Sequence, residues 1–153
     1  MSGREERLRE LGLSLPEVTK PLAAYVPAVR TGNLVFVSGQ LPMVEGKLPL
    51  TGKVGAEVTP EQAKGLAQRA ALNAIAAAAV EAGGIDRITR VVKVTGFVAS
   101  TPDFTGHPGV INGASELIGH VFGEAGAHAR AALGVAALPL DAPVEVEMVV
   151  EVS

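Results

Sequence analysis

The strongest constraint on the fold is a long, alanine-rich segment between Thr59 and Gly83. Thr59 is a preferred N-cap residue, and the Pro60 that follows it is favoured at the first position of a helix. The pair Gly83-Gly84 is a typical helix end. Most apolar side chains between these limits are alanines, which allow a helix to approach a sheet closely. The segment therefore predicts a helix over about residues 60–82 that packs on a β-sheet.

The composition favours a folded chain with a core of small side chains. In 153 residues, 48% are apolar and 19% are charged, so disorder is not expected. The chain has no Trp, one Tyr and four Phe, so Val, Ala, Leu and Ile must fill the core. This high apolar fraction suggests more burial than one small domain offers and favours an oligomer.

Further elements follow from local patterns. Ser2 and Glu5 form a capping-box pattern for a short helix through Leu11, and an extended lead-in follows it. A second long helix is expected over 108–124, and Thr31-Gly32-Asn33 is expected to join two strands as a hairpin. Strands are expected over 25–30, 34–38, 90–99, 128–137 and 143–152, with a further short strand or hairpin within 43–49. We expect residues 1–19 to form an N-terminal lead-in and residues 20–153 one α+β domain, a mixed sheet with both long helices on one face.

Several classes of function are disfavoured. The net charge of −3 gives no basic field for nucleic acid, and aromatic residues for stacking bases are few. The chain has no Cys, and His107, His120 and His128 lack metal-ligand spacing, so no metal or cofactor is expected. No signal peptide and no membrane-spanning run is visible, which favours a cytoplasmic protein.

The last two expected strands place charges opposite apolar faces. Side chains alternate across a strand, so Glu145 and Glu147 lie opposite a row of valines, and Arg130 lies opposite Leu133. If the apolar faces pack under the helices, Arg130 and Glu145 project from the same second face. They are then either solvated surface charges or a site, in which Arg130 binds a carboxylate and a glutamate positions a water. The small residues around Arg130 would leave a concave space (Ala132, Gly134, Ala136).

Two motifs resemble a known family. Residues 129–139 read ARAALGVAALP and are followed by VEVEM at 144–148, which resembles the C-terminal signature of the YjgF/RidA family. Residues 32–42 read GNLVFVSGQLP and resemble the early motif of the same family. The resemblance covers about residues 20–152.

This resemblance implies a chorismate-mutase-like α+β fold and a homotrimer whose sheets line a central barrel, with a site in each cleft between subunits. Family members of the archetypal kind hydrolyse 2-imino or 2-enamino acids to 2-oxo acids and ammonia without metal or cofactor. By position, Arg130 resembles the arginine that binds the substrate carboxylate, and Glu145 the carboxylate that orients water, with Glu147 as the fallback.

Three other positions resemble pocket residues and have plainer alternatives. Tyr25 resembles a tyrosine that closes over the pocket, or is a packing aromatic. Ser38 resembles a serine that lines the pocket, or ends a strand. Asn112 resembles an asparagine at the start of the second helix, or serves as a cap or solvated residue.

The sequence also departs from the family pattern. Ala132 stands where many members have a pocket cysteine. His128 stands where Pro or Ala is usual, and it is either a titratable group in the cleft or a surface residue at a strand end. The N-terminal stretch is longer than in archetypal members. A non-catalytic carboxylate-binding or regulatory trimer is therefore the main alternative to the deaminase. A mutase-like rearrangement is a further one, although one pocket arginine is few for a dicarboxylate.

Overall fold

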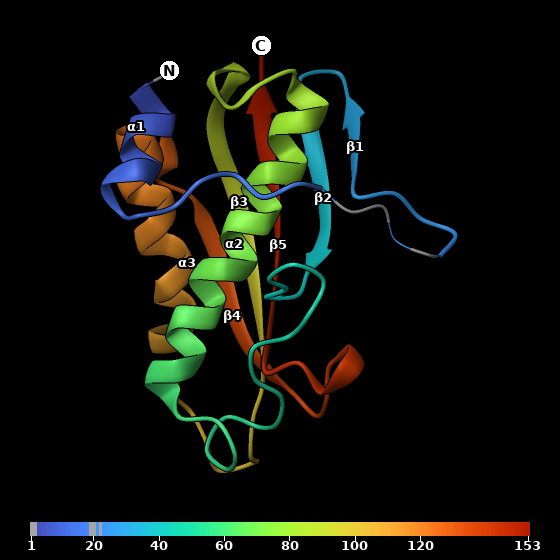
Figure 1. The fold of residues 1–153 in the computed structure, drawn as a ribbon, viewed down its shortest axis with the longest axis vertical. Helices are drawn as coiled ribbons and strands as arrows, with labels where there is room; N and C mark the ends of the chain where they lie inside the picture. The colour runs from blue at the N-terminus through green and yellow to red at the C-terminus, as the bar shows by residue number, and fades with distance from the viewer. Residues whose placement is uncertain (1–2, 19–20, 22) are drawn as a thin grey trace.

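The computed structural model describes residues 3–18, 21 and 23–153 (Figure 1). Its helices are α1 (Gly3–Glu10), α2 (Pro60–Ala82) and α3 (His107–Phe122). Three short 3₁₀ turns are η1 (Ile85–Arg87), η2 (Gly123–Gly126) and η3 (Pro139–Asp141). The strands are β1 (Ala28–Thr31), β2 (Leu34–Gln40), β3 (Ile88–Ala99), β4 (Ala129–Val135) and β5 (Val144–Val152).

The five strands form one mixed sheet in the order β1-β2-β5-β3-β4. The pair β3-β4 is parallel, and the other three pairs are antiparallel. The helices α2 and α3 cover the same face of this sheet, and α1 packs against the outer side of α3 (Figure 1). The predicted α+β architecture with two helices on one sheet face is confirmed, and α1 adds a third helix to that layer.

The alanine-rich helix α2 forms as predicted. The Thr59 side chain accepts a hydrogen bond from the backbone N–H of Gln62, and the Gln62 side chain accepts one from the backbone N–H of Thr59. This reciprocal capping box fixes the start of the helix. At the other end Gly83 has φ 91°, the left-handed conformation of a helix C-terminus. Alanines from Ala63 to Ala82 are buried, so the small side chains do bring α2 close to the sheet.

Several expected boundaries differ from the structure. The first strand starts at Ala28 rather than residue 25, because Pro27 has no N–H to donate to a neighbouring strand. Residues 43–49 contain no extended strand, but Val44 and Lys47 form an antiparallel bridge across Glu45-Gly46, which is the hairpin of the two predicted alternatives. The predicted strand 128–137 is shorter at both ends. The Ser2 position of the expected capping box lies outside the described residues.

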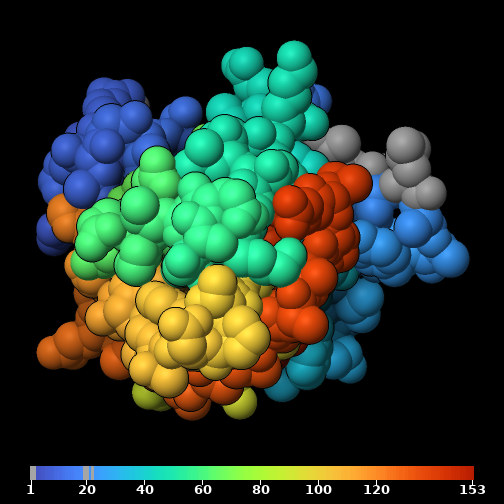
Figure 2. Space-filling view, turned by 90° about the horizontal axis from the view of Figure 1, so that it is seen from below, coloured from blue at the N-terminus to red at the C-terminus, as the bar shows by residue number. Residues whose placement is uncertain are grey.

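The second face of the sheet has no covering layer within one chain. Phe36 lies beside Val149 in the β2-β5 register, and Leu133 lies level with Phe97 and Glu145. Phe36 is 47% exposed and Leu133 is 39% exposed, which is high for large apolar side chains on the face of a sheet. Residues 23–27 also stand out from the side of the body (Figure 2). At the end viewed in that figure, η3 lies against the loop before α2, where Lys53 Nζ contacts Asp141 Oδ1 at 3.1 Å.

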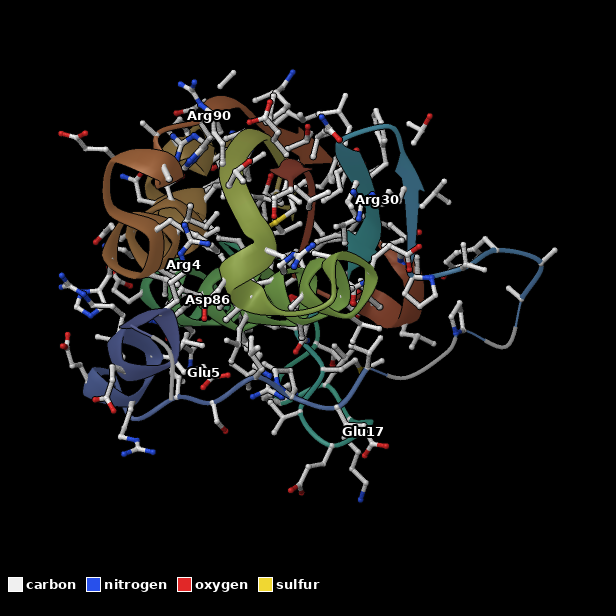
Figure 3. All side chains as sticks on the ribbon, turned by 90° about the horizontal axis from the view of Figure 1, so that it is seen from above. Arg4, Glu5, Glu17, Arg30, Asp86 and Arg90 are labelled. Atoms are coloured by element: carbon white, nitrogen blue, oxygen red, sulfur yellow. The ribbon has the colours of Figure 1, made fainter. Side chains whose placement is uncertain are left out.

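Arg4 holds α1 in place. Its Nη1 group donates to the carbonyl oxygens of Ile85 and Ile88, and its guanidinium lies 4.7 Å from the ring centroid of Phe122. Figure 3 shows Arg4 directed from α1 toward η1, where Asp86 also lies. Together with the buried Leu8, these contacts join the N-terminal helix to the end of α3 and the start of β3.

We therefore expect Arg4→Ala to lower the free energy of unfolding by about 1–3 kcal/mol, since it removes charged hydrogen bonds and a cation–π contact. Urea denaturation measures this change. Arg7→Ala is the matched control, because Arg7 is on the same helix with an exposed side chain. Equal losses in the two variants would contradict the anchoring role of Arg4.

Candidate functional site

Arg130 lies on the helix-covered face of the edge strand β4. Its register partner is Val94 of β3, which is fully buried under the helices and also pairs with Met148. The expectation that Arg130 and Glu145 share a face is therefore wrong. The small residues were misinterpreted: a side chain at Gly134 would collide with the His107 ring, and Ala132 packs against the core. Their small size makes room for α3, not for an open concavity.

The guanidinium of Arg130 is held by neutral acceptors on α3. Nη1 donates to Asn112 Oδ1 at 2.8 Å and to Ser115 Oγ at 3.2 Å, and Nη2 lies 3.5 Å from the carbonyl oxygen of Pro108. No carboxylate within the described ranges forms an ion pair with it. Arg130 is thus a half-buried, oriented cation without an acidic partner in the part of the chain that the structure describes. Such a group can bind a carboxylate with two parallel hydrogen bonds.

Asn112 contacts Arg130 directly. It is in the second turn of α3, so it is not the N-cap, which is Gly106. The capping alternative for Asn112 is therefore excluded, and its side-chain oxygen is one of the acceptors that orient the guanidinium.

Ser115 and His128 extend this cluster, and the sequence analysis did not select Ser115. Ser115 Oγ lies 2.9 Å from His128 Nε2, and His128 Nδ1 lies 2.6 Å from the carbonyl oxygen of Gly126. His128 is half-buried rather than a free surface residue. The signal for Ser115 was its spacing: residues 108, 112 and 115 recur at helical intervals and share one side of α3.

Glu145 lies on the opposite, uncovered face, close to Gly39. A Cβ atom at Gly39 would overlap the Glu145 carboxylate, so the glycine makes room for that group. Burial raises the pKa of Glu145 above its ordinary value, and the neighbouring charge of Glu147 raises it further. Glu147 is on the same face but exposed. Of the two glutamates, Glu145 is the one whose environment suits proton transfer nearer to neutral pH.

Ser38 and Tyr25 lie at the same end as Gly39. The Ser38 hydroxyl donates to the carbonyl oxygen of Val26 at 2.6 Å and so fixes the segment that leads into β1. Tyr25 is 57% exposed and is not packed into the core of this chain. Tyr25 and Gly39 line a cleft of about 940 Å³ between the N-terminal lead-in, residues 39–46 and α2, and Ser38 is next to Gly39 in the chain but does not line it.

The predicted site residues thus fall into two groups. Arg130 and Asn112 lie between β4 and α3. Glu145 lies on the uncovered face of the sheet, and Tyr25 and Ser38 lie at its β1–β2 edge, near Gly39. One chain alone does not bring the two groups together. Residues 3–18, 21 and 23–153 contain no cluster of His, Asp or Glu that could hold a metal ion. In the same ranges, no helix combines the length and the apolar character needed to cross a bilayer.

The mixed five-stranded sheet with its helices on one face is a fold of the chorismate-mutase-like class. A family model described as "YjgF/chorismate mutase-like, putative endoribonuclease" matches residues 5–152. The chain belongs to this family, which is the YjgF/RidA family indicated by its motifs.

Three relatives illustrate the range of the family. Protein TCP17 of Trypanosoma cruzi is 44% identical to this chain, and the similarity covers 99% of this chain and 96% of the length of TCP17. A 2-iminobutanoate/2-iminopropanoate deaminase of Dermatophagoides farinae is 34% identical over 90% of this chain and 93% of its own. The crystal structure of Atu1372 from Agrobacterium tumefaciens, a protein with unknown function, has a TM-score of 0.92 and 48% identity, covering 99% of this chain and 93% of that one. The family therefore includes imine deaminases and also proteins without an assigned activity.

We expect Glu147→Gln to lower the pKa of Glu145, because the substitution removes the like charge that disfavours its ionisation. Carbon-13 NMR titration of the glutamate carboxyl groups measures this directly. Glu151→Gln is the control, since Glu151 is on the same strand but does not contribute to the shift. A pKa of Glu145 that stays constant in Glu147→Gln would show that burial alone raises it.

Proposed function

We propose that this chain is a cofactor-free deaminase that hydrolyses 2-imino or 2-enamino acids to 2-oxo acids and ammonia. The observation that carries the proposal is the half-buried Arg130, oriented by Asn112 and Ser115 and left without an acidic partner among the described residues. A preoriented guanidinium suits a small carboxylate substrate. The similarity to a 2-iminobutanoate/2-iminopropanoate deaminase supports the choice of reaction.

The proposed reaction needs no metal and no covalent nucleophile. The substrate carboxylate binds Arg130, which fixes the imine carbon next to a water that Glu145 holds. Glu145 accepts a proton as the water oxygen bonds to the carbon of the protonated imine, and a neutral carbinolamine forms. Glu145 then returns this proton to nitrogen. As the C–N bond breaks and the C=O bond forms, Glu145 accepts the hydroxyl proton and passes it to the departing ammonia, which leaves as ammonium. Positioning and charge pairing supply most of the acceleration.

The proposed site is assembled from two subunits. Arg130 and Asn112 of one subunit would face Tyr25, Ser38 and Glu145 of its neighbour, because Arg130 and Glu145 lie on opposite faces of the sheet in one chain. The exposed Phe36 and Leu133 on the uncovered face support burial against further copies, as in a homotrimer with a central barrel. This arrangement makes activity depend on assembly.

The alternative is a non-catalytic trimer that binds small carboxylates. The similarity to TCP17 and Atu1372, whose names state no activity, favours keeping it. In that case Arg130 is needed and Glu145 is dispensable.

Ammonia release from freshly generated 2-aminoacrylate and 2-iminobutanoate tests the proposal. We expect Arg130→Ala to lower kcat/KM about tenfold to a hundredfold through lost carboxylate binding. Glu145→Gln should lower kcat by about 10²–10⁴ while 2-oxobutyrate still binds. Because Glu145 must be ionised to accept a proton, wild-type activity should fall as pH drops through its raised pKa. No turnover in a folded wild type that binds 2-oxobutyrate in an Arg130-dependent manner would favour the alternative.

A mixing experiment tests the two-subunit site. Arg130→Ala and Glu145→Gln chains, each of low activity as a homo-oligomer at substrate concentrations below KM, are unfolded together and refolded as mixed trimers. Random 1:1 assembly places an intact arginine beside an intact glutamate at roughly a quarter of the sites, so about that share of wild-type activity should return. Refolded single variants are the controls. If both groups acted within one chain, mixing would restore nothing.

A further inference from the structure

A chain of hydrogen bonds with a fixed direction ends at Arg130. It runs from the carbonyl oxygen of Gly126 in η2 through His128 and Ser115 to Nη1 of Arg130. The four residues come from three places in the sequence, namely α3, η2 and the start of β4. A second Ser–His pair in the same protein, Ser100 Oγ with His107 Nε2 at 3.1 Å, makes no hydrogen bond with Arg130 and serves as an internal comparison.

The carbonyl oxygen at the start of the chain sets the direction of every later bond. A carbonyl oxygen only accepts, so His128 Nδ1, 2.6 Å from it, carries the hydrogen. In a neutral imidazole the other nitrogen, Nε2, is then an acceptor, and the Ser115 hydroxyl donates to it. The lone pairs of Ser115 Oγ are left for the N–H of Arg130.

The guanidinium is thereby held on one side only. Nη1 carries two hydrogens, and its two acceptors, Asn112 Oδ1 and Ser115 Oγ, use both. Nη2 has one acceptor, the Pro108 carbonyl oxygen, at 3.5 Å, which is long for a hydrogen bond. Nε has no acceptor among the described residues. The edge formed by Nε and Nη2 therefore remains able to make the two parallel hydrogen bonds that a carboxylate accepts.

We propose that Ser115 and His128 are positioning residues, which orient the Arg130 guanidinium so that its Nε–Nη2 edge meets the carboxylate of the ligand. This inference rests on the proposed function insofar as Arg130 is the carboxylate-binding residue. It gives His128 a role that depends on its Nε2 acceptor: without that acceptor the Ser115 hydroxyl is free to rotate and offer its hydrogen toward Arg130. The guanidinium then loses one of the two bonds that fix its plane.

Equilibrium binding of 2-oxobutyrate to the full chain, followed by calorimetry, tests this separately from turnover. Ser115→Ala should raise Kd about fivefold to tenfold, because it removes one acceptor of a charged donor. Two substitutions of His128 separate its two nitrogens. His128→Gln keeps an acceptor near the position of Nε2 and should bind like wild type. His128→Asn keeps a donor near Nδ1 but lacks that acceptor, and it should match Ser115→Ala.

Steady-state kinetics give the readout that a merely structural role would not produce. Weaker carboxylate binding raises KM and leaves kcat nearly unchanged, whereas a partly unfolded variant loses kcat at constant KM. Ser100→Ala is the matched control. It breaks a hydrogen bond of similar length, between Ser100 and His107 at the start of α3, and should change neither KM nor kcat.

The outcomes distinguish this inference from the function on which it rests. Wild-type affinity in Ser115→Ala and His128→Asn, with binding lost in Arg130→Ala, would overturn the positioning role and leave the proposed function intact. Unchanged 2-oxobutyrate binding in Arg130→Ala would overturn both. Loss of kcat at constant KM in every variant, Ser100→Ala included, would assign these residues to folding alone.

Discussion

Because β4 pairs in parallel with β3 at the edge of the sheet, its helix-facing side chains meet α3 rather than solvent. This contact decides the chemistry available to Arg130. Pairing with Val94 turns Arg130 toward the polar side of α3, and the missing side chain at Gly134 lets His107 and the start of that helix come close. The result is a cation whose geometry is set by a helix and whose open edge lies at the margin of the sheet. Its ligand must therefore approach from outside the chain's own core.

The same topology separates the acid–base group from the cation. Glu145 lies on β5 at the centre of the sheet, on the face that α2 and α3 leave uncovered, while Arg130 lies on the covered face. In the proposed function these two groups act on one small molecule, although the thickness of the sheet separates them within one chain. A second copy of the chain is the simplest means of joining them, and the apolar side chains on the uncovered face give such an association a hydrophobic driving force.

Much of the fold could be predicted from the sequence, but not the direction in which β4 faces. Caps and periodicity located α2, and the order of elements indicated a mixed sheet with its helices on one side. The alternation in β4 showed which residues share a face. It could not show which face is covered, because that depends on the register with β3. Small residues were consistent with either a cavity or a close helix contact. Ser115 was missed because its helical spacing from residues 108 and 112 does not point to a site until its partners from η2 and β4 are known.

The position of the only tyrosine has a consequence for spectroscopy. With no tryptophan in the chain, ultraviolet-excited fluorescence comes mainly from Tyr25, which is exposed in the segment before β1. The core of valine, alanine, leucine and isoleucine contributes nothing to that emission. An emission change therefore reports the surroundings of this one segment, such as its burial against another molecule. Melting of the core must be followed through the backbone, for example by far-ultraviolet circular dichroism.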